Sequence, residues 1–336
     1  MRDLFIYFDF HKEVSWIKKV QSQEYSRVPG TLSKLADYYL RKRLDILGEK
    51  PLVVDRRLGR PFPYMAFWFA DAFGLANSEA VRKLALSLVY ISICVSARDD
   101  LVDAKLRLNG RKVSTHALTC LMDLYYNKYF QIFKALFPPT SRFWYVISNC
   151  FNDWQAYEAW SFLFNSLDDF DPLSQHFLRK SSQYLLAITL PTIAATAFLT
   201  NNEPKIPQIT RYLRYYWMGW KMVDDIKDWE RDINTPKFSH SSVIHHAIKK
   251  YGMRKKLTVR DMQSMFLSKN YVIEIYDSLL GRYKKAQHNL SSFDSKYLKE
   301  FMNSQIQLHS DERNLHLNRI SKFNEGIRDL ILREGL

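Results

Sequence analysis

Three aspartates within five positions follow a long apolar run. The stretch "SARDDLVDAK" places Asp99, Asp100 and Asp103 directly after "LALSLVYISICV". If the preceding helix continues through residue 103, Asp103 lies three and four residues after the other two, and the carboxylates share a face. Like charges at this spacing destabilise a helix by roughly 0.2–0.5 kcal/mol per pair, so a bound cation would relieve the repulsion. A solvated helix end neutralised by Lys105 and Arg107 would also explain the pattern.

A second acidic cluster lies far along the chain. In "GWKMVDDIKDWERDI", Asp224, Asp228 and Asp232 follow one another at four-residue intervals and form one stripe on a helix. This cluster also follows an apolar and aromatic run, "YLRYYWMGWKMV". Carboxylates without neighbouring His or Cys suit Mg²⁺, which commonly bridges carboxylates to substrate phosphates. Two such clusters that face each other across an apolar cavity would form a magnesium and diphosphate site.

Both clusters resemble the metal motifs of class I isoprenoid synthases. Asp99-Asp100-Leu-Val-Asp103 resembles their DDxxD motif, and the stretch from Asp224 to Asp232 resembles their second motif. "WKMVDD" is similar to the FQ-x-x-DD of chain-elongating prenyltransferases, and the spacing matches the N-D-x-x-S-x-x-x-E triad of terpene cyclases. The resemblance implies an α-helical bundle and three Mg²⁺ ions that bind an allylic diphosphate. The metal-ligand candidates are Asp99, Asp100, Asp103, Asp224, Asp228 and Asp232.

Basic residues near the motifs could stabilise the departing diphosphate. The residues predicted to act in catalysis are Arg179, Lys180 and Arg231, at positions where the family keeps diphosphate-binding cations. The resemblance adds Lys221 and Lys237 as contacts to the diphosphate. A late arginine of the family could correspond to Arg282 or Arg313, and the sequence leaves that choice open. Solvated surface charge is the alternative for each of them in a chain with 49 Lys and Arg.

A carbocation needs an apolar pocket whose walls do not react with it, and aromatic faces stabilise cations by roughly 0.5–2 kcal/mol each. Small residues just before the first motif predict a pocket deep enough for a farnesyl or longer chain. Ordinary core packing is the alternative for the aromatic residues. The predicted wall residues are Phe67, Cys94, Val95, Trp217 and Trp220.

Helices must position both clusters. Apolar residues recur at three- and four-residue spacing in the ranges 78–108, 113–136, 141–166, 174–200, 207–233 and 258–290. The segments 83–97 and 184–199 are apolar nearly all round, which places them inside a multilayer bundle. The sequence contains no repeat or linker. We therefore expect an all-α fold, a single isoprenoid-synthase-like domain spanning residues 1–336, with a central apolar cavity.

Net charge and apolar segments limit the classes of binding partner that the sequence suggests. The formal net charge of +14 suits nucleic acid, an anionic membrane surface or a phosphorylated substrate. No nucleic-acid-binding signature is evident, and the longest apolar stretch is too short for a bilayer and contains Pro191. We expect a cytoplasmic enzyme without a transmembrane segment, with peripheral membrane contact and a homodimer left open. Cys94, Cys120 and Cys150 lack metal-ligand spacing.

The family contains two reactions that fit these residues. A chain-elongating trans-prenyl diphosphate synthase also binds isopentenyl diphosphate, through basic residues near the N-terminus. Here "DRRLGRP" supplies Arg57 and Arg60, but Leu58 occupies the second basic position. Elongating enzymes also usually carry paired arginines shortly after the first motif, whereas Arg107 and Arg111 are separated here. The sequence analysis therefore favours a terpene synthase, which ionises one prenyl diphosphate and cyclises or quenches the cation. The elongating enzyme is the alternative, and a non-catalytic basic module that binds nucleic acid or membrane is a remote one.

Overall fold

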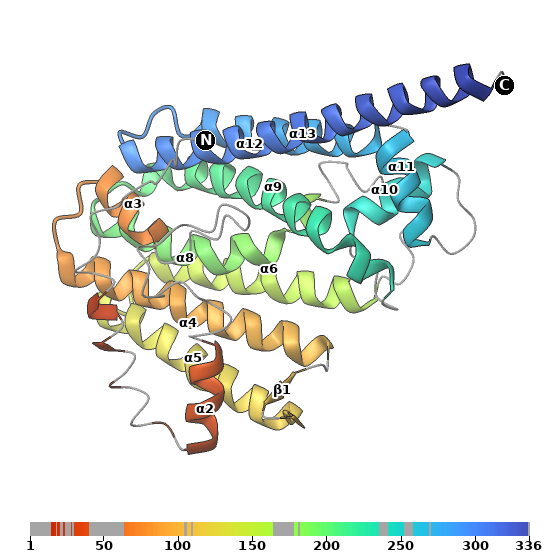
Figure 1. The fold of residues 1–336 in the computed structure, drawn as a ribbon. Coiled ribbons are helices and arrows are strands. Elements are labelled where there is room, and N and C mark those ends of the chain that lie inside the picture. The colour runs from red at the N-terminus through yellow and green to blue at the C-terminus, as the bar shows by residue number, and fades with distance from the viewer. Residues whose placement is uncertain are drawn as a thin grey trace. The chain divides into compact units, whose positions relative to one another are not determined.

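Helices make up nearly all of the described chain, which confirms the predicted all-α fold class (Figure 1). The computed structural model describes residues 15–17, 19–20, 23, 28, 30–39, 64–103, 106–108, 110–163, 178–180, 182–234, 241–251, 258–268 and 270–334. The helices are α2 (Gly30–Tyr38), α3 (Tyr64–Ala72), α4 (Ser78–Asp103), α5 (Thr115–Leu136), α6 (Phe143–Leu163), α8 (Gln183–Leu199), α9 (Ile206–Ile233), α10 (Ser242–Tyr251), α11 (Val259–Ser268), α12 (Tyr271–Asn289) and α13 (Lys296–Glu334). A short 3₁₀ helix, η2, spans Glu203–Lys205.

The chain forms two compact units. Unit 1 contains Met1–Cys150, Ile188–Pro207 and Phe293–Leu298, and unit 2 contains Phe151–Ala187, Gln208–Ser292 and Lys299–Leu336. The first acidic cluster belongs to unit 1, and the second belongs to unit 2. The assignment of residues 1–336 to one domain stays a prediction.

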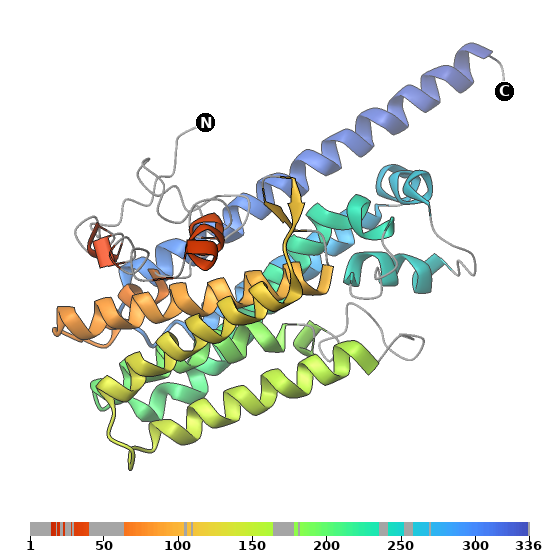
Figure 2. The same cartoon turned by 90° about the horizontal axis from the view of Figure 1, so that it is seen from below.

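In unit 1, α4 packs along α5 (Figures 1 and 2). Its helix continues through Asp103, the condition on which the shared face of the first cluster depends. The helical spacing of apolar residues runs to residue 108 in the sequence, but β1 (Arg107–Leu108) and β2 (Arg111–Lys112) form an antiparallel hairpin. Gly110 adopts φ 77° in its turn, a conformation that glycine adopts without strain.

The apolar helix α4 is also tied to α8 by hydroxyl groups. Ser87 and Thr192 form a hydrogen bond of 2.8 Å between their side-chain oxygens, and Ser87 Oγ also lies 2.7 Å from the Leu84 carbonyl oxygen. By length and composition Ser78–Leu101 could cross a membrane, but 83% of its apolar window is buried within the fold. Burial of this extent is typical of a core helix.

In unit 2, α12 contacts both α9 and α13. Gln208 of α9 donates to the Asn289 carbonyl at 2.9 Å, and Arg313 of α13 pairs with Asp277 of α12 at 2.6 Å. The range 258–290, in which apolar residues recur at helical spacing, contains two helices, and Asn270 with φ 52° lies between α11 and α12. Helix α13 lies outside the ranges predicted from periodicity.

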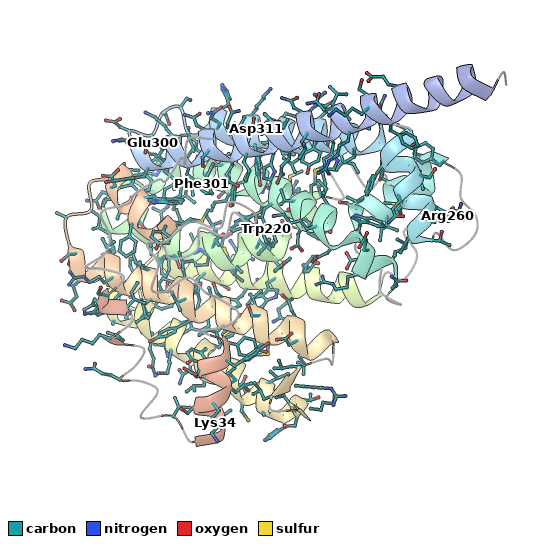
Figure 3. The ribbon with its side chains drawn as sticks, viewed as in Figure 1. Lys34, Trp220, Arg260, Glu300, Phe301 and Asp311 are labelled. Carbon is teal, nitrogen blue, oxygen red and sulfur yellow. The ribbon has the colours of Figure 1, made fainter. Side chains whose placement is uncertain are left out.

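Aromatic side chains fill the interior of unit 2. Trp220 and Phe301 are almost fully buried, whereas Glu300 is partly buried and Asp311 is exposed on α13 (Figure 3). Tyr216 packs on Phe301 with ring centroids 5.6 Å apart and stacks on Tyr283 at 5.8 Å. These contacts hold the middle of α9, immediately before its acidic stripe.

Candidate metal and diphosphate site

The carboxylates of the first cluster have different environments. Asp99 is exposed, whereas Asp100 is 8% exposed and accepts a hydrogen bond of 2.7 Å from the Tyr39 hydroxyl. The backbone of Asp103 belongs to α4, and its side chain lies outside the description. Tyr39 follows α2, so Asp100 helps to hold the end of α2 against α4. Asp99 stays a predicted metal ligand at the end of a buried helix.

The second cluster forms the stripe that the spacing predicts. Asp224, Asp228 and Asp232 follow one another along the last turns of α9, and each is partly exposed. Arg231 lies on this stripe, because its Nη2 donates to Asp228 Oδ2 at 2.5 Å and lies 3.6 Å from Asp232 Oδ1. The predicted catalytic arginine therefore contacts two of the predicted metal ligands.

Electrostatics make this stripe receptive to cations. Burial raises the pKa of Asp228, and the charge of Asp224 raises it further against the attraction of Arg231. Burial also raises the pKa of Asp232 to about 6, with Asp225 adding to the shift and Lys221 opposing it. Partly desolvated carboxylates that repel each other and offer only oxygen donors fit Mg²⁺. This chemistry of the donor set is why these residues suit a magnesium ion.

One consequence concerns the metal-free protein. Because the folded pKa of Asp232 exceeds its ordinary value of 3.8, its contribution to stability is lost as the pH rises from about 4 to about 6. Asp232→Asn should therefore be more stable than the wild type at pH 7 in EDTA, by about 1–3 kcal/mol, and equally stable near pH 4. Urea unfolding of both proteins at the two pH values measures this difference. A constant difference across that range would contradict the assignment.

Asp225, next to Asp224, is a buried and fully engaged carboxylate that the sequence analysis did not single out. It is 1% exposed and has three hydrogen-bond donors around it. Lys221 Nζ donates to Oδ1, and the backbone N–H and the hydroxyl of Ser242 donate to Oδ2 at 2.9 and 2.5 Å. The i, i+4 spacing from Lys221 to Asp225 is the signal in the sequence that could have shown this pair.

The other predicted cations lie elsewhere in the chain. Arg179 and Lys180 are exposed on a short helical turn before α8. Burial lowers the pKa of Arg214 on α9, and repulsion from Arg179 lowers it further, so Arg179 lies near that residue. Lys237 lies outside the described residues. The structure thus brings Lys221 and Arg231 to the stripe, and the contacts of Arg179 and Lys180 with a diphosphate stay predictions.

The predicted wall residues are all at least partly buried. Phe67 is 2% exposed, Val95 is partly buried, and Cys94 is fully buried with its thiol directed to the Met122 carbonyl of α5 at 3.4 Å. Burial raises the pKa of the Cys94 thiol. Trp217 and Trp220 pack edge to face in unit 2, with ring centroids 5.9 Å apart. Their position around a substrate stays a prediction.

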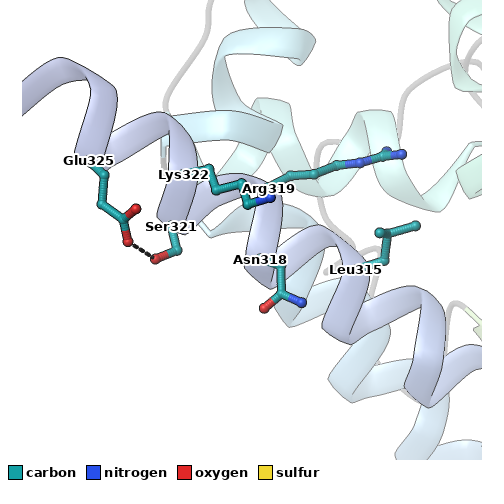
Figure 4. A pocket seen from close by; sticks show the side chains of 6 residues that line it. All are labelled: Leu315, Asn318, Arg319, Ser321, Lys322 and Glu325. Carbon is teal, nitrogen blue, oxygen red and sulfur yellow. Dashed lines mark hydrogen bonds between the residues drawn. The ribbon is translucent and has the colours of Figure 1, made fainter.

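The convergence of the two clusters across a cavity also stays a prediction. Among the residues with described side chains, no group of three or more His, Cys, Asp or Glu is gathered closely enough to hold a metal. A shallow groove lies on α13 and contains no predicted site residue (Figure 4). Ser321 donates to Glu325 at 3.0 Å beside it. The groove is lined by Leu315, Asn318, Arg319, Ser321, Lys322 and Glu325.

Comparisons with known proteins agree with this fold. No family model matches the chain, and no curated protein matches it. Among solved structures, a geranylgeranyl pyrophosphate synthetase from the archaeon Geoglobus acetivorans is similar with a TM-score of 0.66 and 16% identity, covering 89% of this chain and 97% of that one. A geranyltranstransferase from Methanosarcina mazei has a TM-score of 0.59 and 12% identity, covering 89% and 97%.

A third similar structure is a polyprenyl synthase from Caulobacter crescentus, complexed with calcium and isoprenyl diphosphate. Its TM-score is 0.59 at 14% identity, and the match covers 89% of this chain and 96% of that one. The chain therefore shares the all-α fold of these synthases, the fold that the resemblance to class I isoprenoid synthases implies. The names of these structures describe synthases of prenyl chains, the alternative that the sequence analysis ranked second.

Proposed function

We propose that this protein is a magnesium-dependent trans-prenyl diphosphate synthase that extends an allylic diphosphate with isopentenyl diphosphate. The observation that carries the proposal is the partly buried stripe of Asp224, Asp228 and Asp232, on a helix of a fold shared with such synthases. Bound Mg²⁺ would stabilise charge on the departing pyrophosphate. Lys221 and Arg231, both in contact with acidic residues at the end of α9, would bind the diphosphate oxygens, and these contacts support that role.

A terpene synthase is the second candidate. Leu58 occupies a position where the isopentenyl diphosphate site of the family has a basic residue. Arg107 and Arg111 lie on the two paired strands of a hairpin and are not adjacent in the sequence. These departures favour an enzyme with one diphosphate substrate. The solved structures favour two substrates, and we rank the elongating enzyme first for that reason.

One experiment separates these functions. Purified protein with Mg²⁺ is incubated with geranyl, farnesyl or geranylgeranyl diphosphate, with and without isopentenyl diphosphate, and the products are analysed before and after acid hydrolysis. A longer prenol that forms only with isopentenyl diphosphate supports the elongating enzyme. A hydrocarbon or alcohol without it identifies a terpene synthase. Salt-sensitive retention on DNA without any turnover would instead support a binding module.

Val95 offers a test of the predicted pocket. It precedes Asp99 by one helical turn on α4 and is partly buried, so a larger side chain should shorten the space for the prenyl tail. We expect Val95→Phe to shift the products towards shorter chains while turnover of the shortest accepted substrate persists. Val259→Phe, at a partly buried position on α11, is the control. An unchanged product distribution in Val95→Phe would place the pocket elsewhere.

A further inference from the structure

Asp225 is adjacent to a predicted metal ligand, yet its carboxylate is already engaged. One oxygen accepts from the Lys221 ammonium, and the other accepts from the backbone N–H and the hydroxyl of Ser242. The residue is 1% exposed. A metal at Asp225 would have to displace these donors and leave the ammonium of a nearly buried lysine without its carboxylate. Loss of one partner from such a pair is strongly unfavourable.

The positive charge of Lys221 interacts with all three carboxylates of the stripe. Its side chain is 12% exposed, and Asp225 fixes its ammonium. Burial alone would lower the pKa of Lys221, but the carboxylates of Asp225 and Asp224 outweigh burial and raise it. The charge of Lys221 also acts on Asp228 and Asp232. A permanent cation therefore lies beside three carboxylates that are predicted to hold magnesium.

Ser242 fixes Asp225 from a different helix. It is fully buried at the first residue of α10, and it lies 17 positions from Asp225 in the sequence. Its backbone N–H is one of the donors that a helix leaves unpaired at its start, and the carboxylate satisfies it. The hydrogen bonds from α10 thus fix the orientation of the Asp225 carboxylate. That carboxylate in turn fixes the ammonium of Lys221 on the same helix.

We infer that Asp225 is a positioning residue, held by Ser242, that orients Lys221 towards the diphosphate of the substrate and is not a metal ligand. The inference rests on the proposed function, because it requires a diphosphate at the stripe. The inference assigns different roles to the two adjacent aspartates. Asp224 is predicted to bind the metal, and Asp225 acts through Lys221.

The test uses Mn²⁺ and inorganic pyrophosphate as probes, measured by calorimetry on the full chain. Asp224→Asn should lose Mn²⁺ binding. Asp225→Asn should bind Mn²⁺ within about twofold of the wild type but bind pyrophosphate with Mn²⁺ about tenfold more weakly, the worth of one hydrogen bond to a charged group. Lys221→Gln should weaken pyrophosphate similarly. The double variant should be no weaker than either single one, because both changes remove one interaction.

Ser242 gives an independent measurement if Asp225→Asn does not fold. Ser242→Ala should weaken pyrophosphate binding about threefold, and Ser242→Thr, which keeps the hydroxyl, should restore it. Ser241→Ala is the matched control, since Ser241 is also buried and its hydroxyl has no hydrogen-bond partner among the described residues. Equal binding by Ser242→Ala and Ser241→Ala would overturn the inference.

Two other outcomes also overturn it. Loss of Mn²⁺ binding in Asp225→Asn, as in Asp224→Asn, would make Asp225 a ligand. Additive losses in the double variant would show that Lys221 acts without Asp225. These results leave the proposed function intact if the wild-type protein binds Mn²⁺ and pyrophosphate and turns over prenyl diphosphates. A wild-type protein that binds neither probe and shows no turnover overturns the proposed function together with the positioning role.

Discussion

Asp224→Asn is expected to lower magnesium-dependent turnover of a prenyl diphosphate on the order of a thousandfold or more, because loss of metal stabilisation costs several kcal/mol in the transition state. Asp224 begins the stripe on α9, and asparagine keeps its shape while removing the charge. The circular dichroism spectrum should be unchanged. Asp99→Asn, at the exposed predicted ligand of the first cluster, should have a similar effect.

Glu230→Gln is the matched control for Asp224→Asn. Glu230 lies in the same part of α9 but is exposed, and it is outside the four-residue spacing of the stripe. Its neutralisation should change turnover less than about twofold, since exposed charges contribute little. Turnover is measured by release of pyrophosphate at saturating Mg²⁺. Full activity of Asp224→Asn would mean that the stripe does not hold the catalytic metal.

Gly219→Ala is expected to reduce the free energy of unfolding by about 1–3 kcal/mol, the usual effect of adding a methyl group to a packed core. A Cβ atom at Gly219 would lie 2.5 and 2.7 Å from two ring carbons of Tyr283. The ring is fully buried and packs against Tyr216 and, at 5.6 Å between ring centroids, against His309, so these neighbours oppose its displacement. The clash lies five residues before Asp224 on α9, so turnover should also fall.

Gly281→Ala provides the opposite expectation on α12. Apart from its chain neighbours and the backbone of its own helix, no atom of the described residues lies within 4 Å of an added Cβ at Gly281, and alanine is preferred over glycine inside a helix by about 0.5–1 kcal/mol. This variant should be slightly more stable than the wild type. Urea or thermal unfolding of both variants measures the difference between them. Equal stabilities would show that α9 and α12 do not approach as closely as described.

Local pattern predicted the helices and missed the breaks between them. The long apolar face of α4 continues through Asp103, as its spacing indicates. Two short features lie within ranges or next to elements where the helical period gave no sign of them: the hairpin turn at Gly110 and the left-handed Asn270. Both depend on the conformation of single residues, which a hydrophobic period does not report. Helix α13, with 39 residues, was not predicted because its sequence is largely polar and shows no clear apolar period.

Prediction of the site residues was also limited to features within one helix. Four-residue spacing predicted the stripe on α9 because its residues belong to one helix. The partners of Asp100 and Asp225 come from Tyr39 and Ser242, which lie 61 and 17 positions away, and no local pattern joins them. Family motifs predicted the superfamily fold. The choice between one and two diphosphate substrates depended on single basic positions, and there the sequence analysis ranked first the function that the solved structures favour less.

The hydroxyl bond between Ser87 and Thr192 has a consequence for synthesis of the chain. Thr192 is made 105 residues after Ser87, so a nascent chain carries α4 without the partner that this bond supplies. During that interval a stretch apolar enough to enter a bilayer lacks its contact with α8, although α5 has already been made, and exposed apolar surface promotes aggregation. Chaperone protection or slow elongation in this window would therefore affect the yield of folded protein more than changes after α8 has emerged.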